Sequence, residues 1–98
     1  MGQGDIVLVR SSRGQPGVRR IWDDGPERPF VCHEEYWARW ERQGLAPVCS
    51  QVGRDQIFDY DAALAAQLEE AFWASRNSDL AATKRLNQMW EQARPRRV

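Results

Sequence analysis

The first 60 residues alternate short apolar runs with turns that contain glycine or proline, a pattern typical of β-strands. Residues 5–10 form an aliphatic run between polar, glycine-containing segments, which predicts a strand with both faces buried. Residues 15–17, Gln-Pro-Gly, predict a tight turn, because proline fixes one backbone angle and glycine accepts the next. Residues 18–22 are the predicted returning strand, so the chain is expected to begin with a β-hairpin.

The hydrophobic period changes to that of a helix in residues 33–43. Tyr36, Trp37 and Trp40 fall on one helical face and charged side chains cover the other, which predicts an amphipathic helix. Gly44 is suited to end this helix in the left-handed conformation. We expect the three rings to hold the helix on a sheet rather than to form a ligand cage. Further short strands are predicted at residues 30–32, 48–52 and 56–60.

Residues 61–93 contain neither glycine nor proline, and their periodicity predicts two helices. Asp61 is the expected N-cap of the first helix, and Asn77 or Ser78 is expected to open the second. Two helices joined by so short a link should form an antiparallel hairpin. The predicted apolar faces are Leu64, Leu68 and Phe72 with Ala65 and Ala71 in the first helix, and Leu86, Met89, Trp90 and Ala93 in the second. Pro95 should stop the second helix.

These elements predict a single α+β domain over residues 1–98. Its β-rich part spans residues 1–60 and contains the inserted helix 33–43, the helical hairpin spans 61–93, and 94–98 form a basic tail. The sheet should be small, bent and antiparallel.

The opening Gly4-Asp5-Ile-Val-Leu-Val9, with its glycine-rich turn and second strand, is similar to the start of many SH3-like barrels. It also resembles the start of ribonuclease toxins of the MazF type, in which a Gly-Asp strand leads to a loop and an Arg-Arg pair. This resemblance covers about a fifth of the chain and ends where the helix of Trp37 and Trp40 is inserted. It implies an SH3-like barrel and, as an alternative function, a toxin-like RNA-cleaving module.

Composition narrows the functional classes. Of 98 residues, 42% are hydrophobic and 29% charged, which is ordinary for a globular protein. The 14 basic and 14 acidic side chains cancel, which disfavours general attraction to nucleic acids or to membranes. No apolar run is long enough for a membrane span or a signal peptide. We therefore expect a cytoplasmic protein whose cysteines are reduced.

Cys32, His33 and Cys49 are the residues whose chemistry suits a metal or a nucleophile. Zinc usually takes four ligands, so three candidates do not predict a metal site, and no cofactor is expected. Adjacent strand residues point to opposite faces, so Cys32 and His33 should not share a proton, whereas Cys49 and His33 remain an open pairing across strands. We expect both cysteines in the core, and an enzyme that depends on cysteine or metal is the third hypothesis.

Arginines gather around the predicted first hairpin, together with a tryptophan. This arrangement is a candidate groove for a single-stranded nucleic acid, with guanidinium groups for phosphates and a ring for base stacking. The candidate residues are Arg10, Arg13, Arg19, Arg20 and Trp22. Neighbouring acidic side chains such as Asp23 and Asp24 favour the alternative of a solvated hairpin with local ion pairs.

The helical hairpin carries more large apolar side chains than its two predicted faces use. Trp73 lies off the first apolar face and Leu80 off the second, so an exposed apolar patch is expected there. The predicted partner-binding residues are Trp73, Leu80, Phe72 and Trp90. The favoured function is a non-catalytic protein-interaction module that forms a homodimer, and a nucleic-acid-binding module is the alternative.

Overall fold

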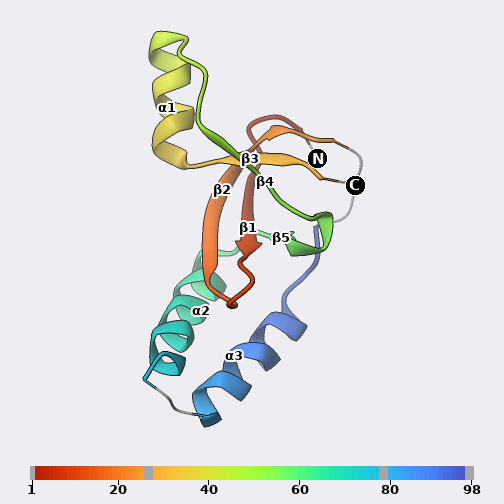
Figure 1. Ribbon diagram of the computed structural model, residues 1–98, viewed down its shortest axis with the longest axis vertical. Coiled ribbons are helices and arrows are strands. Elements are labelled where there is room, and N and C mark those ends of the chain that lie inside the picture. Colours follow the sequence, from red (N-terminus) through yellow and green to blue (C-terminus); the bar gives the residue numbers. More distant parts are fainter. Residues whose placement is uncertain (1, 26–27, 78–79, 97–98) are drawn as a thin grey trace.

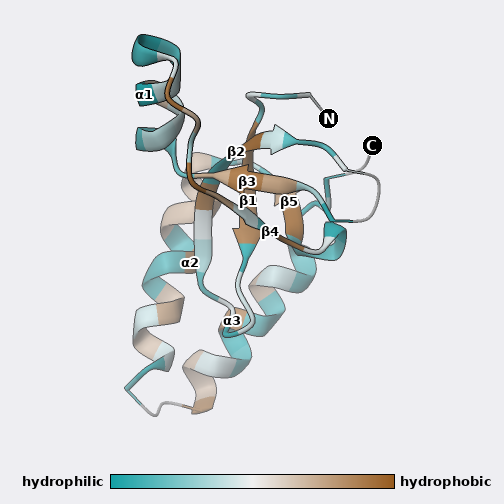
Figure 2. Ribbon diagram, turned by 45° about the horizontal axis from the view of Figure 1, so that its top comes forward, coloured by the Kyte–Doolittle hydropathy of each residue, from teal (hydrophilic) through white to brown (hydrophobic). Residues whose placement is uncertain are grey.

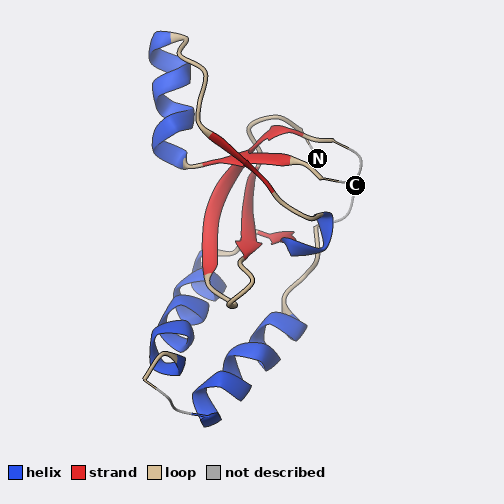
Figure 3. Ribbon diagram, viewed as in Figure 1, coloured by secondary structure: helices blue, strands red, loops and turns tan. Residues whose placement is uncertain are grey.

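The computed structural model describes residues 2–25, 28–77 and 80–96. Within these residues the chain forms strands, helices and one 3₁₀ turn, η1 (Figures 1 and 3). In chain order the elements are β1 (Ile6–Arg10), β2 (Pro16–Asp23), β3 (Phe30–Cys32), α1 (Glu34–Gln43), β4 (Cys49–Gln51), η1 (Arg54–Gln56), β5 (Ile57–Asp59), α2 (Ala62–Ser75) and α3 (Leu80–Gln92). Ser78, one of two residues expected to open the last helix, lies outside the described residues.

The five described strands form one antiparallel sheet in the order β4-β3-β2-β1-β5. β1 pairs with β2 from Ile6↔Arg20 to Arg10↔Pro16 and with β5 on its other side. The strands do not close into a barrel. The predicted α+β class, the inserted helix and the helical hairpin are confirmed, whereas the closed form expected of a barrel is not observed.

The first turn lies earlier than predicted. Gly14 adopts the left-handed conformation, with φ of 82°, and the backbone N–H of Ser11 donates to the carbonyl of Gln15 over 3.0 Å. Pro16 and Gly17, predicted as the turn, instead belong to β2. Proline is tolerated as the first residue of a strand. The side chain of Ser11 provides the turn chemistry, because its Oγ accepts from the N–H of Gln15 at 2.9 Å.

Both faces of the sheet carry core residues, as the apolar run predicted. Val7 and Leu8 are consecutive in β1 and both fully buried, so they contribute to opposite faces. The face of Leu8 and Phe58, called the helix face below, packs on Leu68, Ala71, Phe72, Leu86, Trp90 and Ala93 of the helical hairpin and the residue after it. The other face, called the valine face, is formed by Val7, Ile21, Val31 and Ile57, with Val9 and Val52 partly buried beside them.

Local signals place the helix ends where the sequence predicts them. Asp61 caps α2 by accepting from the N–H of Leu64 at 2.9 Å. Gly44 follows α1 with φ of 71°, and its N–H donates to the carbonyl of Trp40 over 2.8 Å. These two caps are confirmed.

The segment after α3 pairs with the edge of the sheet along β5. The N–H of Asp59 donates to Arg94 over 2.8 Å, and the N–H of Arg96 donates to Ile57 over 3.0 Å. The guanidinium of Arg96 lies 2.8 Å from a carboxylate oxygen of Asp5. The predicted basic tail is thus held against the sheet as far as Arg96, and residues 97–98 lie outside the described residues.

The described chain is elongated, with extents of 45 × 25 × 21 Å. Figure 1 shows α1 at one end of the long axis and the end of α2 with the start of α3 at the other, with the sheet between them. Figure 2 shows the apolar residues concentrated in the central strands, while α1 is largely hydrophilic. The two ends of the long axis and the valine face are therefore the surfaces considered below.

Candidate functional site

The closed end of the helical hairpin exposes two large apolar side chains. Trp73, near the end of α2, is 54% exposed, and Leu80, at the start of α3, is 70% exposed. Phe72 and Trp90 were predicted in the same partner-binding set, but both are buried. Their side chains face the core, so the exposed part of the set is Trp73 and Leu80.

Helix geometry explains why neighbouring rings separate. Phe72 and Trp73 point about 100° apart around α2, so only one can face the sheet. Phe72 joins Leu68 in the core, and the Trp73 ring meets it edge-on with centroids 5.4 Å apart. Arg76 lies over both rings, 5.9 Å from the centroid of Phe72 and 6.0 Å from that of Trp73. Trp73 is thus oriented by its neighbours although half its surface meets solvent.

Apolar exposure at the other end of the molecule was not predicted. Leu45 and Val48, in the segment between α1 and β4, are 50% and 65% exposed. The sequence signal is the uncharged run Leu45-Ala46-Pro47-Val48 directly after Gly44. This run lies far from the hairpin end along the long axis (Figure 1), so the two patches are separate surfaces.

Trp22 belongs to a cluster of rings that holds α1 on β2. Its centroid lies 4.9 Å from that of Trp40 and 6.1 Å from that of Trp37, both edge-on. The β2–β3 register shifts between Ile21 and Asp23, which places Trp22 at an irregularity of the strand. Trp37 is buried, as expected of a ring that anchors a short helix. Trp22 therefore supports α1 and is not a free stacking platform.

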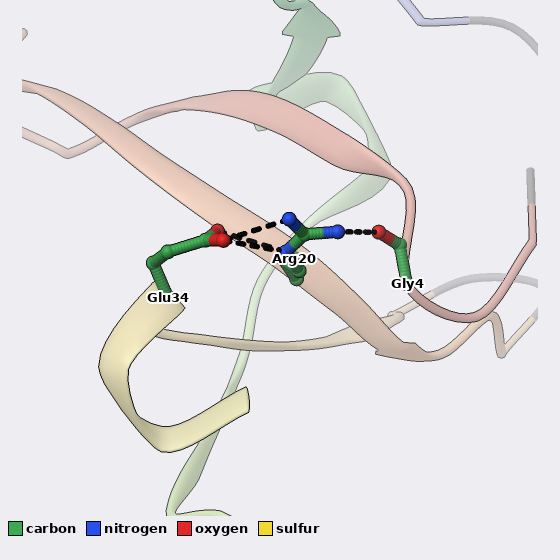
Figure 4. A network of polar contacts seen from close by, with 3 residues as sticks. All are labelled: Gly4, Arg20 and Glu34. Atoms are coloured by element: carbon green, nitrogen blue, oxygen red, sulfur yellow. Dashed lines mark hydrogen bonds and ion pairs between the residues drawn. The ribbon is translucent and has the colours of Figure 1, made fainter. Parts of the chain in front are cut away.

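Arg20 is fully engaged in the fold (Figure 4). Its Nε and Nη2 donate to both carboxylate oxygens of Glu34, at 2.7 to 2.9 Å, and its Nη1 donates to the carbonyl of Gly4 at 2.8 Å. The hydrogen bonds between the two side chains raise the pKa of Arg20 and lower the pKa of Glu34. The arginine ties β2 to the start of α1 and to the turn before β1, which is a structural role.

The other candidate arginines point in different directions. Arg10 lies toward α3, where its Nη2 donates to Asn87 Oδ1 over 3.5 Å and its guanidinium lies 5.6 Å from the Trp90 ring centroid. Arg13 is exposed in the first turn. Arg19 is opposite Val7 in the β1–β2 pair and so lies on the valine face. The structure does not bring the predicted nucleic-acid-binding residues into one groove.

A pocket of about 260 Å³ opens on the valine face. The strands β1, β2, β3 and β4 each supply lining residues, because they are neighbours in the sheet. Its polar lining includes Arg19, His33, Ser11, Ser50, Gln15 and Gln56. Sequence reasoning missed this pocket, because its residues are spread over 48 positions of the chain, from Val9 to Gln56, and converge only through strand pairing.

Cys32 and Cys49 are direct partners in the β3–β4 pair and are both free thiols. Cys32 is buried, and burial raises the pKa of its thiol to about 11, with Cys49 adding to the rise. Burial also raises the pKa of Cys49, which is only half-buried. His33 instead lines the pocket on the valine face, so the two cysteines converge without it. Within the described residues, no group of three or more His, Cys, Asp or Glu side chains could hold a metal ion.

In the part of the chain that the structure describes, every helix is too short or too polar to cross a membrane. Comparisons of this chain with protein-family models, with curated proteins and with solved structures found no match. The function is therefore inferred below from the exposure, contacts and charge of individual residues.

Proposed function

We propose that this protein is a non-catalytic interaction module that self-associates through the closed end of its helical hairpin. The observation that carries the proposal is the exposure of Trp73 and Leu80, 54% and 70%, at a place where the other large apolar side chains of both helices turn inward. Tryptophan is a frequent anchor at protein interfaces, because a large ring is removed from water at little cost in side-chain entropy.

A second copy of the same chain is the partner we propose. A two-fold interface buries the same patch on both subunits, so a patch with an exposed ring and an aliphatic side chain can complement itself. The chain carries no net charge, so two copies meet without long-range repulsion. Trp73 is also held by Phe72 and Arg76, which reduces the entropy lost when it becomes buried.

Sedimentation equilibrium and light scattering across a dilution series test this proposal. Wild-type protein should show a concentration-dependent dimer, and Trp73→Ala should weaken it by about 2 kcal/mol, or about 30-fold. Leu45→Ala is the matched control, because Leu45 is 50% exposed at the other end of the molecule and should leave association unchanged. A wild-type chain that stays monomeric at high concentration, or an equal effect of Leu45→Ala, would contradict the proposal.

We also propose that the sheet is an open relative of the SH3-like barrels. Support comes from the meander β1 to β4 and from β5, which follows a 3₁₀ turn and returns to pair with β1. The alternative function, a nucleic-acid-binding or toxin-like RNA-cleaving module, has weaker support. Arg20 is engaged by Glu34 and Trp22 by the rings of α1, so neither is available to a nucleic acid.

A further inference from the structure

The pocket on the valine face combines one positive charge with an uncharged polar and apolar lining. Its apolar wall is formed by Val9, Val31, Val52 and Pro16. Gln56 is a fixed part of the wall, because its Nε2 donates to the carbonyl of Arg10 at 3.0 Å and its Oε1 accepts from the N–H of Gly53 at 2.7 Å. None of the eleven lining residues is acidic.

Arg19 supplies the positive charge and has no carboxylate partner among the described residues. Its one hydrogen bond there runs from Nη1 to its own neighbour's carbonyl, Val18, at 2.9 Å. Arg20, the next residue, points to the opposite face of the sheet and forms a bidentate ion pair with Glu34. Burial lowers the pKa of the Arg19 guanidinium, because the charged form loses water. A guanidinium nevertheless stays protonated at physiological pH.

Gly17 gives this guanidinium its position. A Cβ at Gly17 would lie 2.9 Å from the Cζ and Nη1 of Arg19 and 3.0 Å from its Nη2. The guanidinium therefore lies flat against the glycine, in the space that a side chain would fill. The backbone of Gly17 has no positive φ, so this close contact, and not turn geometry, is what glycine permits here.

We propose that this pocket binds a small molecule that carries an oxyanion, a phosphate or a carboxylate, on a compact apolar body. Arg19 matches either oxyanion with two parallel N–H donors. Ser50 and His33 can donate further hydrogen bonds, and Val9, Val31 and Val52 face the apolar body. A volume of about 260 Å³ is close to the lower end of the range for small-ligand sites, about 300 Å³, and suits a ring with one anionic group.

Amide chemical shifts of the full, ¹⁵N-labelled chain test the proposal with three probes of similar shape. Phenyl phosphate and benzoate carry the two oxyanions, and benzyl alcohol is their neutral analogue. We expect saturable shifts at Gly17, Arg19, His33 and Ser50 with one or both anions, and the tighter of the two identifies the oxyanion source. Benzyl alcohol should bind at least tenfold more weakly.

Four substitutions separate recognition of the anion from loss of the fold and from the proposed dimer. Arg19→Met keeps an unbranched aliphatic side chain but removes the guanidinium, and should weaken anion binding at least tenfold. Arg13→Met, in the exposed turn outside the pocket, should change it less than twofold. If Arg19→Met does not fold, Ser50→Asp provides the test instead. This substitution, on the exposed edge strand, adds a negative charge to the lining and should abolish anion binding. Trp73→Ala should bind the anions as the wild type does, so this site and the proposed dimer are tested independently.

The proposal is overturned if neither anion gives saturable shifts, or if benzyl alcohol binds as tightly as the anions. Shifts spread over the surface and equal in Arg13→Met and Arg19→Met would also overturn it, because they indicate unspecific attraction to arginines. Anion binding that survives Ser50→Asp would have the same consequence, since the added carboxylate should compete for the guanidinium.

Discussion

Trp90→Phe should be among the most destabilising conservative substitutions in this protein. Trp90 is buried, with 1% of its surface exposed, and its Nε1 donates to the carbonyl of Gly14 over 2.7 Å. This bond ties α3 to the turn between β1 and β2, 76 residues away in sequence. The ring also packs on Phe58, with centroids 5.0 Å apart. Phenylalanine keeps much of the ring contact but cannot donate to Gly14.

The expected loss has two parts. Gly14 is buried although the residues on either side of it are exposed, and leaving a buried acceptor without a partner costs about 1–3 kcal/mol. The smaller ring leaves a cavity in the core between sheet and hairpin, which costs about 1 kcal/mol. The sum, about 2–4 kcal/mol, is a large part of the 5–15 kcal/mol that is typical of a folded domain.

Urea unfolding followed by circular dichroism measures this loss, at a protein concentration low enough for a monomer. The slope with urea should stay the same, so that the midpoint alone reports stability. Trp73→Phe is the matched control, because that ring is 54% exposed, and it should change the free energy of unfolding by less than about 0.5 kcal/mol. A loss below about 1 kcal/mol for Trp90→Phe, or one equal to that of Trp73→Phe, would refute the reasoning.

Three further predictions concern the cap, the thiols and nucleic acids. Asp61→Ala should cost about 1 kcal/mol in urea unfolding, because α2 loses its N-cap hydrogen bond, and an unchanged midpoint would contradict the cap. Cys32 should react with a thiol reagent much more slowly than Cys49 in the native state, and both should react rapidly in denaturant. Burial raises the Cys32 pKa from 9.0 to about 11. The contribution of the buried, protonated thiol to the free energy of unfolding should therefore be complete below pH 9 and be lost as the pH rises toward 11. An equal loss of stability in wild type and Cys32→Ala over this interval would contradict the prediction. Single-stranded RNA should bind no better than about 10⁻⁴ M at physiological salt, and micromolar binding that weakens in Arg19→Ala and Arg20→Ala would show that the arginines act together after all.

The sequence by itself determined the features whose causes lie within a few residues. The N-cap needs only Asp61 and the amide of Leu64 three positions later, and the end of α1 needs only Gly44 after Trp40. The strand at 30–32 and the apolar faces of both hairpin helices follow in the same way, from side-chain periodicity. Such local signals survive in the folded chain because backbone geometry and nearest-neighbour contacts already favour them.

The first turn shows the limit of local reasoning. Both segments 11–14 and 15–17 contain turn residues, and the choice between them depends on the pairing register of β1 with β2. The register Arg10↔Pro16 keeps the buried Val7 of β1 and Ile21 of β2 on one face, and a shift of one residue would turn the side chains of one strand to the other face. Pro16 then falls at the start of a strand, where its missing N–H is tolerated.

Only the tertiary structure decided which candidate residues became available to a ligand or a partner. Helix phase predicts that Phe72 and Trp73 diverge, but the packing of the hairpin on the sheet buries Phe72 and exposes Trp73. Strand alternation places Arg19 and Arg20 on opposite faces of the sheet. Only the folded chain pairs Arg20 with Glu34 and places Arg19 in the pocket on the valine face. These outcomes depend on contacts between segments that are distant in sequence. Forming such contacts costs chain entropy, and this cost is offset only when all strands and helices pack together, so the contacts are a property of the whole chain.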